Sequence, residues 1–403
     1  MKKSCGLDVH KDTIFCAIYD GKLQSEVKEF STTTISINNM GEYLQSENVE
    51  EIAMESTGIY WIPVWNILEE MTFNLMLVNP YLIKQMPGRK SDIKDAQWIS
   101  ILLHKGMLRG SLIPCKEIRE LRTYSRKYIK LQQRQVSVLQ ELERTLELCG
   151  IRITSLVSNI SGKSVQKIIY KIIEGEDNAE ELLKQVHGRI SNKHGKEKVI
   201  EALTGFVLPH HRFILEQTME EYELLLRQSE RLLSKMNELC KLHYSKEFEL
   251  LITIPGVSDI SAMILIAETG ADMKAFENSG KFTGWIGLRP RNDESAGKYK
   301  STATTKGNKY LRAMLVQIAW AAIKTKNSDF KDKFNRLSMR KSRKKALIAI
   351  ARKIAVVTWN ILKTQKTYSP NILVVLQKEK VQAKLNYHQK EFEKLEKIIS
   401  CLA

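Results

Sequence analysis

The amino-acid sequence predicts a mixed α/β N-terminal domain followed by mainly helical regions. Within the first hundred residues, short apolar runs typical of strands alternate with helical stretches. Beyond about Pro114 the sequence becomes long, charged and helical in its periodicity. A chain of 403 residues is too long for one ordinary core, so we expect two or three folded domains.

The elements of the α/β part can be assigned in chain order. The stretch SCGLDVHKDTIFCAIYD reads as a strand, a polar turn from His10 to Asp12 and a second strand. Two further strands, VEEIAMES and FNLMLVN, flank the helical stretch YWIPVWNILEEM. The helix in SDIKDAQWISILLHKG then begins at Ser91 or Asp92 and ends at Gly106. The alternation predicts a mixed sheet covered by helices.

Two later stretches carry the heptad spacing of coiled coils. The second is the more regular, and its seam residues alternate in steps of four and three: Leu215, Met219, Tyr222, Leu226, Ser229, Leu233, Met236, Cys240 and His243. The first stretch, 118–149, keeps the same period more loosely. A polar region that contains glycine separates the two. The pattern suits either an antiparallel coiled-coil arm or a dimerisation helix, and it does not choose between them.

A third, mainly helical unit begins at ELLITIPGVSDISAMILIAETG. Its IPGVSDIS resembles a helix-hairpin-helix, with Gly256 in a tight turn before a helix whose N-terminal amides can accept a phosphate. Past Pro370 a heptad resumes at Val381, Leu385, Phe392, Leu395, Ile399 and Leu402, with His388 in one core position. The expected parts are an α/β domain (1–112), a helical coiled-coil region (113–247), a basic domain (248–370) and a C-terminal heptad helix (371–403).

The positive charge is concentrated in one segment. The chain has a net charge of +17, whereas residues 281–370 alone hold 22 Lys and Arg against 4 Asp and Glu. The rest of the chain is therefore nearly neutral. A segment that carries the whole excess is typical of nucleic-acid binding. A solvated helix face usually mixes both signs, and a membrane-binding protein would show a basic amphipathic anchor.

Other features indicate a cytoplasmic protein that does not enter a membrane. The six cysteines are scattered without a CxxC pair, as expected of free thiols in a reducing compartment. The N-terminus reaches Asp8 before an apolar region of a signal peptide could form. The apolar stretch ALIAIARKIAVVTWNIL carries Arg352 and Lys353 at its middle, so we expect a packed amphipathic helix.

Four carboxylates of the α/β part stand out. Asp8 lies in the first strand, Glu55 ends a later strand, and Asp92 and Asp95 lie three residues apart in the first turn of a helix. Singly, each has an ordinary explanation as a turn residue or as an acid that suits the helix dipole. Together they form an oxygen-rich set suited to Mg²⁺ or Mn²⁺ on a scissile phosphate. The pattern therefore suggests a metal-dependent nucleic-acid enzyme with a ribonuclease-H-like fold.

Basic residues lie near the four carboxylates and near a second candidate site at Ser295. They suit contacts to the phosphate backbone better than base reading. Ser295 lies in a loose basic loop and reads either as an ordinary turn serine or as a nucleophile in a cationic setting. The candidate nucleic-acid contacts are Arg89 and Lys90 before the helix acids, Gly256 in its turn, Arg289, Arg291 and Lys298 around Ser295, and Lys306, Lys309 and Arg312 after it.

Eight motifs occur in a recognisable order. They are GLDVHKDT, MESTGIYWIPVW, VNPYLIKQMPGRKSDIKDAQWI, SGKSVQKII, PHHRF, IPGVSDISAMILIAETG, GWIGLRPRNDESAGK and KGNKYLRAMLVQIAW. With them the chain resembles the transposases of the insertion sequence one-ten family, also called DEDD or bridge-RNA-guided recombinases. The resemblance runs from about residue 5 to about residue 369. Some members have glycine directly after the serine, whereas Ala296 intervenes here, as in members with the ESAG form.

The resemblance implies a site, a cofactor and partners. It places the four acids of a RuvC-like, Mg²⁺-binding domain on Asp8, Glu55, Asp92 and Asp95, and the serine nucleophile on Ser295. The two domains, from different protomers, would build a composite site. A phosphoserine intermediate would then exchange strands without net hydrolysis. The implied partners are donor and target DNA, an element-encoded noncoding guide RNA, and copies of the chain in a dimer or a tetramer.

Two other hypotheses remain open. A metal-only nuclease acting on junctions could use the same four carboxylates with water as the nucleophile. A non-catalytic coiled-coil protein could bind nucleic acid without cleaving it. An actin-like sugar kinase shares the strand pattern, but the sequence has no phosphate-binding glycine motif for that role.

Overall fold

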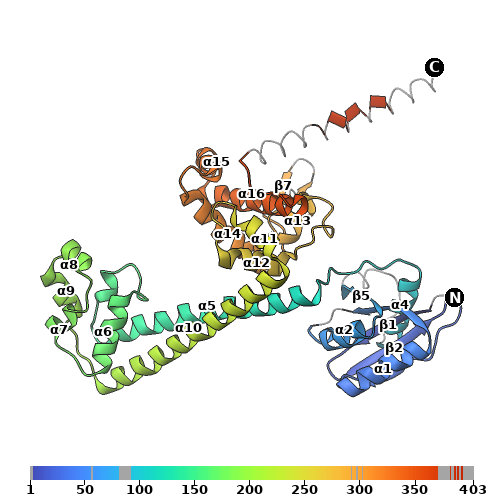
Figure 1. Cartoon of the computed structure of the whole chain (residues 1–403), viewed down its shortest axis with the longest axis horizontal. Coiled ribbons are helices and arrows are strands. Elements are labelled where there is room, and N and C mark those ends of the chain that lie inside the picture. Colours follow the sequence, from blue (N-terminus) through green and yellow to red (C-terminus); the bar gives the residue numbers. More distant parts are fainter. Residues whose placement is uncertain are drawn as a thin grey trace. The chain divides into compact units, whose positions relative to one another are not determined.

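The computed structural model contains an N-terminal α/β unit, Met1–Pro114, and a larger helical unit, Cys115–Ala403 (Figure 1). Each unit is described by itself. The structure describes residues 3–55, 58–80, 92–291, 293–295, 298–301 and 303–370, together with Gln382, Leu385, Asn386, His388, Gln389, Phe392 and Glu393. The side chains of residues 92–94, 293–295 and 298–300 lie outside this description.

The α/β unit is built on one mixed five-stranded sheet. Its elements are β1 (Lys3–Val9), β2 (Thr13–Tyr19), β3 (Lys28–Ser31), α1 (Thr34–Ser46), β4 (Val49–Glu55), α2 (Trp61–Glu70), β5 (Asn74–Val78) and α4 (Asp92–His104). The strand order is β3-β2-β1-β4-β5. The pairs β3–β2 and β2–β1 are antiparallel, whereas β1–β4 and β4–β5 are parallel. The order agrees with the ribonuclease-H-like arrangement expected from the sequence.

Alternation along the strands gives the sheet two different faces. Cys5, Leu7 and Val9 of β1 point to one side, where they join a core with α1 and α2. The residues between them point to the other side, where Gly6 meets helix α4. Because side chains alternate in a strand, Asp8 belongs to the same face as Gly6. The helix α4 and the acidic residue therefore share one side of the sheet.

The helical unit begins with a long two-helix arm. Its elements up to the end of the arm are α5 (Lys116–Leu148), a 3₁₀ turn (Ile153–Ser155), α6 (Lys163–Ile173), α7 (Ala179–Leu183), α8 (Gly188–His194), α9 (Lys196–Leu203) and α10 (Pro209–His243). Cys115, just before α5, contacts Tyr244, just after α10, at 3.3 Å between Sγ and Oη. Farther along, Gln135 of α5 contacts Ser229 of α10. The two helices therefore run antiparallel, as Figure 1 shows.

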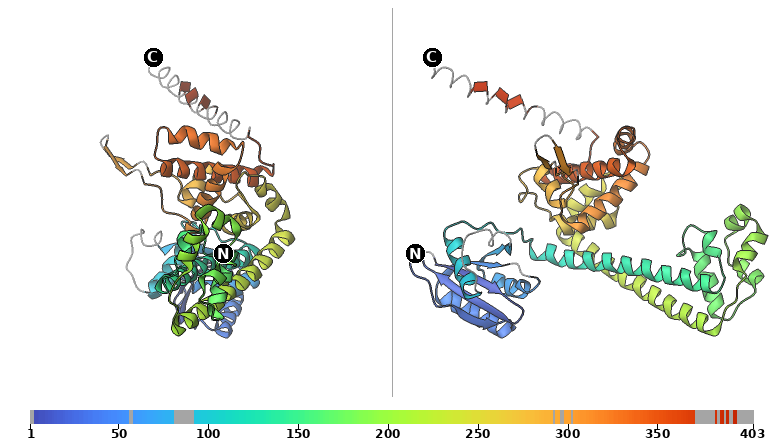
Figure 2. Two further views of the ribbon diagram at one scale, coloured as in Figure 1. Left: turned by 90° about the vertical axis from the view of Figure 1, so that its left-hand side faces the viewer. Right: turned by 180° about the vertical axis from the view of Figure 1, so that it is seen from behind.

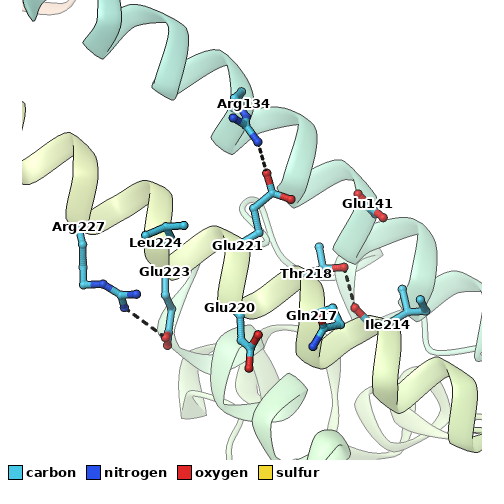
Figure 3. A pocket seen from close by; sticks show the side chains of 10 residues that line it. All are labelled: Arg134, Glu141, Ile214, Gln217, Thr218, Glu220, Glu221, Glu223, Leu224 and Arg227. Atoms are coloured by element: carbon cyan, nitrogen blue, oxygen red, sulfur yellow. Dashed lines mark hydrogen bonds and ion pairs between the residues drawn. The ribbon is translucent and has the colours of Figure 1, made fainter.

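The predicted seam packs within the chain, as expected of the antiparallel coiled-coil arm. Leu215, Met219, Tyr222, Ser229, Met236 and Cys240 are buried, Leu226 and Leu233 are half-buried, and His243 is exposed. The amide of Gln135 donates to Ser229 Oγ at 2.9 Å and to the Leu225 carbonyl at 3.1 Å. Because the hydrogen bond from Gln135 satisfies the Ser229 hydroxyl, a serine can be buried at this seam position. On the outer surface Arg134 pairs with Glu221 across the helices (Figure 3).

Two hydrophobic cores share the arm. One core lies at the distal end of the arm, which is the end away from the C-terminal helices, and joins residues of α5 and α10 to the short helices α6 to α9. The other joins the opposite end of the arm to the C-terminal helices. The remaining elements are α11 (Ser245–Ile252), α12 (Asp259–Thr269), α13 (Ser279–Ile286), β6 (Asp293–Ser295), β7 (Lys298–Ser301), α14 (Lys309–Lys324), α15 (Asp329–Ser338) and α16 (Arg343–Thr364). The predicted class, α/β followed by mainly helical structure, is confirmed.

Helix α16 includes the apolar stretch that the sequence assigns to a packed helix. Ile350, Ile354 and Ile361 are fully buried, whereas Arg352 and Lys353 are half-buried. None of the helices in the described ranges is long and apolar enough to cross a membrane.

The predicted heptad tail falls mostly outside the described residues. Val381, Leu395, Ile399 and Leu402 lie outside the description. Leu385, His388 and Phe392 are helical and exposed. The predicted pairing of this tail therefore stays a prediction.

A buried carboxylate joins the arm to the C-terminal helices. Glu268, near the end of α12, has no exposed surface. The guanidinium of Arg126 on α5 donates to its two oxygens at 2.8 and 3.0 Å, and hydrogen bonding to Glu268 raises the pKa of Arg126. Arg122 donates to the Glu268 backbone carbonyl at 3.0 Å, and Asn308 donates to the carboxylate at 2.6 Å. One side chain thus links α12, α5 and the start of α14.

We predict that Arg126→Ala lowers the free energy of unfolding by about 3 kcal/mol, because it leaves the buried Glu268 carboxylate without its main partner. The matched control is Arg134→Ala on the same helix, which removes only the surface pair with Glu221 and costs less than about 1 kcal/mol. Urea unfolding of the two variants provides the comparison. Equal losses would show that the Glu268 pairing contributes no more than a surface ion pair.

Candidate active site: a carboxylate cluster and a serine hairpin

Two carboxylates lie at the ends of neighbouring parallel strands. Asp8 is the penultimate residue of β1 and is only 5% exposed, and Glu55 ends β4. Leu7 pairs with Met54 in the ladder, so Asp8 and Glu55 occupy the next matched positions. Because the carboxyl ends of parallel strands meet at one edge of a sheet, the two acids are neighbours there.

Close packing of α4 on the sheet brings a third carboxylate to this edge. A Cβ at Gly6 would overlap the backbone of Ala96 and Ser100, so glycine is required for α4 to approach β1 this closely. Asp95 immediately precedes Ala96 in the first turns of α4. Asp8 and Asp95 are near enough for their charges to interact. The helix therefore presents its acidic N-terminal end to the strand acids.

Burial is the main cause that raises the pKa of Asp8 above its usual range. The imidazole of His10, whose Nε2 lies 3.1 Å from Asp8 Oδ2, acts in the opposite direction. The negative charges of Glu55 and Asp95 raise the pKa further. The cluster thus gathers like charges that a cation would neutralise.

The donor chemistry of the cluster fits a hard divalent cation. Asp8, Glu55 and Asp95 supply carboxylate oxygens, which Mg²⁺ and Mn²⁺ prefer. Asp92, the expected fourth ligand, begins α4, but its side chain is not among those described. In the described part of the chain, no three His, Cys, Asp or Glu side chains are already grouped around one metal position. The fit therefore rests on the kind and convergence of the donors.

Ser295 lies in a β-hairpin of the helical unit. It ends β6 and pairs in the ladder with Lys298 of β7. The ladder continues toward the base of the hairpin, where the Arg291 amide donates to the Ala303 carbonyl and the Thr305 amide to the Arg289 carbonyl. Figure 2 shows the hairpin projecting from the helices. The expected loose basic loop is thus a two-stranded projection in its described residues.

The base of this hairpin is held by backbone packing and by the Glu268 network. Gly307 lies so close to Trp285 and Gly287 that a side chain at this position would overlap their backbone. Asn308 caps α14 by accepting from the Tyr310 and Leu311 amides. Its amide donates to Glu268, so the chain leaving the hairpin is tied to the buried carboxylate.

Sequence reasoning missed Glu268 and its partners. A signal was present, since Glu268 is an acidic residue near the end of the apolar helix ISAMILIAET. The C-terminal end of a helix disfavours negative charge, and an apolar run of this kind is buried. An acid in such a place indicates a buried cationic partner, but the sequence does not show that the partner is Arg126.

The predicted nucleic-acid contacts fall into three groups. Arg289, Arg291, Lys306 and Lys309 are exposed, Arg312 is half-buried, and Lys309 Nζ lies 5.2 Å from the Tyr310 ring centroid. Gly256 lies in the turn between α11 and α12 at φ 87°, packed against the backbone of Ala322 in α14. Arg89 and Lys90 lie outside the described residues, as does the side chain of Lys298.

A further group of cations in the basic segment lies between α15 and α16. Arg340, Lys341, Arg343, Lys344 and Lys345 are all exposed at the turn between α15 and α16. Three of them lie in the first turn of α16, which holds no acidic residue. Positive charge is unfavourable at a helix N-terminus, so this turn suits a polyanion that neutralises it.

Comparison with known protein families adds to this geometry. Residues 248–335 match the family described as Transposase IS116/IS110/IS902 family. Residues 5–151 match a second family, DEDD_Tnp_IS110, described as Transposase. The first match contains the serine hairpin and the second contains all four acids. Together the matched stretches cover more than half of the chain.

Curated proteins give consistent similarities. The chain is 32% identical over 155 residues to a putative transposase, y4pF/y4sB, of Sinorhizobium fredii, covering 37% of this chain and 39% of that protein. It is 21% identical over 331 residues to a probable family 20 transposase of Pseudomonas aeruginosa, covering 79% and 86%. It is 33% identical over 120 residues to the transposase for insertion sequence element IS1111A of Coxiella burnetii, covering 29% and 33%.

Among solved structures, RuvC of T. thermophilus in complex with a Holliday junction substrate is similar at 12% identity and a TM-score of 0.22. The match covers 28% of this chain and all of that one. The stretches matched in the first and third relatives span less than two thirds of those proteins. The two family matches span the carboxylate unit and the serine hairpin of one chain, and the chain belongs to the IS110 (insertion sequence one-ten) family of transposases.

Proposed function

We propose that this protein is a DNA transposase that cuts DNA strands and rejoins them in a new place. The observation that carries the proposal is the position of Asp8 and Glu55 at matched ends of β1 and β4, with Asp95 of α4 close enough for its charge to act on Asp8. Family membership supports DNA as the substrate. The basic segment supports contact with its phosphates, because exposed cations there have few acidic neighbours in sequence.

The carboxylates Asp8, Glu55, Asp92 and Asp95 would hold Mg²⁺ or Mn²⁺. When bound, such an ion polarises a phosphate oxygen and stabilises the charge that develops during its displacement. The protein contributes the arrangement of the acids. Gly6 lets α4 approach the sheet, and the parallel register of β1 and β4 sets Asp8 beside Glu55.

We assign the nucleophile to Ser295. Its Oγ would bond to the phosphorus of a DNA phosphodiester while the bond from phosphorus to one sugar oxygen breaks. The serine hydroxyl loses its proton, and the released sugar oxygen gains one. The phosphoserine link keeps the phosphodiester energy, so a DNA hydroxyl can displace the serine and reseal the strand. The cations Arg289 and Arg291 at the hairpin base support this step, because they stabilise added negative charge.

Recognition of donor and target DNA would come from base pairing with a noncoding RNA of the element. Family membership is the support for this part of the proposal. The exposed cations of the C-terminal helices suit backbone contacts, which position a nucleic acid without reading its sequence. A division in which RNA reads sequence and protein holds the backbone is known in other RNA-guided enzymes. We further propose that the protein acts as a homo-oligomer on DNA.

Ser295→Ala is expected to reduce transposition by at least about 1,000-fold, because no other group replaces a missing nucleophile. Transposition of a marked copy of the complete element in cells provides the measurement. Ser301→Ala, in the other strand of the same hairpin, is the matched control and should retain activity. Normal transposition by Ser295→Ala would rule out the serine mechanism and leave a water-using nuclease as the better account.

Asp8→Asn is expected to remove the stabilisation that Mg²⁺ or Mn²⁺ gives to the folded protein. A ligand present at 100 times its Kd stabilises by about 2.7 kcal/mol, so the wild type should unfold at a higher temperature with metal than in EDTA. The control is Asp12→Asn in the exposed turn after β1, which should respond like the wild type. An undiminished metal response in Asp8→Asn would exclude Asp8 as a ligand.

The raised pKa of Asp8 predicts a pH dependence for the metal-free protein. An acid whose pKa is raised by folding binds its proton more tightly in the folded state, so stability falls as pH rises through that pKa. Asp8→Asn removes this loss. In EDTA the variant should therefore melt at a higher temperature than the wild type at pH 7, and the gap should close at pH 3. A gap that is constant across this range would contradict the burial effect.

A further inference from the structure

The distal end of the arm contains a cavity that the proposed chemistry does not use. The cavity has a volume of about 450 Å³ and lies among the loop before α6, the start of α6, and α8. Its walls include the apolar side chains of Leu156, Val165 and Ile190. At roughly 30 Å³ per water the space would hold about fifteen waters, which is more than a single phosphate ion needs.

The charged side chains that line this cavity are all basic. Lys163 from α6 and Arg189 and Lys193 from α8 contribute cations, and no Asp or Glu lines the cavity. None of these three cations has an ion-pair partner within the described ranges of the chain. Other lysines at the same end of the arm are paired, such as Lys171 with Glu174 and Lys184 with Glu181. The basic lining therefore differs from the mixed charge around it.

Backbone amides without a side-chain cap lie at the same space. Helix α6 begins at the cavity with Gly162 as its N-cap, so no side chain caps it, and its first turn holds no acidic residue. His194 supplies a second, independent sign. It lines the cavity, and its Nε2 is buried without a hydrogen-bond partner among the described atoms. A buried polar atom of this kind indicates an absent partner.

A neighbouring histidine is oriented by the backbone at the same wall. The Arg189 amide donates to His187 Nδ1 at 3.2 Å, which leaves Nε2 as the protonated nitrogen of the neutral ring. The His187 amide in turn donates to Ser164 Oγ at 3.1 Å, which ties the start of α8 to the start of α6. The two helices that supply the cations are therefore connected, and their spacing is fixed by the fold.

We propose that this cavity binds a backbone phosphate of a nucleic acid, with the adjoining sugar against its apolar wall. Arg189 and the two lysines supply charge, and the α6 amides and His187 supply donors, which together suit a phosphodiester. The inference rests on the proposed function, because it takes nucleic acid as the partner. It adds a contact outside the basic segment, within a part of the chain whose overall charge is small.

The position of the cavity determines the distance that a bound nucleic acid must span. Helix α5 has 33 residues, so at 1.5 Å per residue the arm is about 50 Å long. The cavity lies at the end of the arm away from the core that carries the serine hairpin. A nucleic acid held at both ends of the helical unit must therefore span a distance of this order, as a duplex or a folded RNA can.

The test compares binding of the full-length chain to a fluorescein-labelled 40-nucleotide single strand, made once as DNA and once as RNA of the same sequence. Anisotropy titrations over a range of salt concentrations give Kd and its salt dependence. The variant is Arg189→Ala/Lys193→Ala. The matched control is Lys196→Ala/Lys198→Ala, which removes the same charge from exposed positions of α9 that do not line the cavity.

The cavity variant should bind about tenfold more weakly at 0.1 M salt, and its salt slope should fall by about 0.7, as for one lost phosphate contact on a single strand. The control should change Kd less than twofold. An equal loss on both strands supports a phosphate contact common to them, and a larger loss on RNA assigns the cavity to RNA. Equal changes in the cavity variant and the control would overturn the inference.

A second measurement distinguishes the loss of a contact from a folding defect. The ring proton signals of His194 should shift when unlabelled oligonucleotide is added to the wild type, and the melting temperature of the cavity variant should match that of the control. No shift of His194 on saturation would also overturn the inference. Failure of the wild type to bind either strand would overturn the proposed function as well, whereas normal binding with unchanged variants would overturn the inference alone.

Discussion

The helical unit depends on one ion pair, in which the partly exposed Arg126 of the arm donates two hydrogen bonds to the fully buried Glu268 carboxylate. A carboxylate without exposed surface requires such partners, because desolvation otherwise disfavours its charge. Asn308 adds a third bond and at the same time caps α14. This network therefore links α5, the end of α12 and the chain that leaves the serine hairpin at one place.

The two candidate catalytic elements are positioned by different means. The carboxylates are set by sheet register and by the close approach of α4 at Gly6, which are properties of a well-packed core. Ser295 lies on a two-stranded projection that is fixed mainly at its base, and a hairpin of this kind has little packing of its own. The acids are thus held in advance of substrate binding, whereas the hairpin gains most of its support from the residues around Gly307 and Asn308.

The sequence predicted what local patterns determine. Alternation and apolar runs located β1, β2, β4 and β5, and heptad spacing located the arm. It did not locate β3, whose four residues are mostly exposed and are held by pairing with β2. The antiparallel pairing of the arm and the matched positions of Asp8 and Glu55 on parallel strands depend on residues far apart in the chain. Glu268 carried a local signal, an acid in an apolar helix, but its partner Arg126 lies 142 residues away.

The proposed serine mechanism requires that Ser295 become covalently bound to DNA. Cells carrying the complete element would be lysed under denaturing conditions, the DNA digested with nuclease, and the peptides that contain residues 292–298 analysed by mass spectrometry. The serine mechanism predicts a nucleotide remnant linked through phosphate to the Ser295 side chain. Cleaved element ends that carry no protein, with this peptide recovered unmodified, would contradict it and would favour water as the nucleophile.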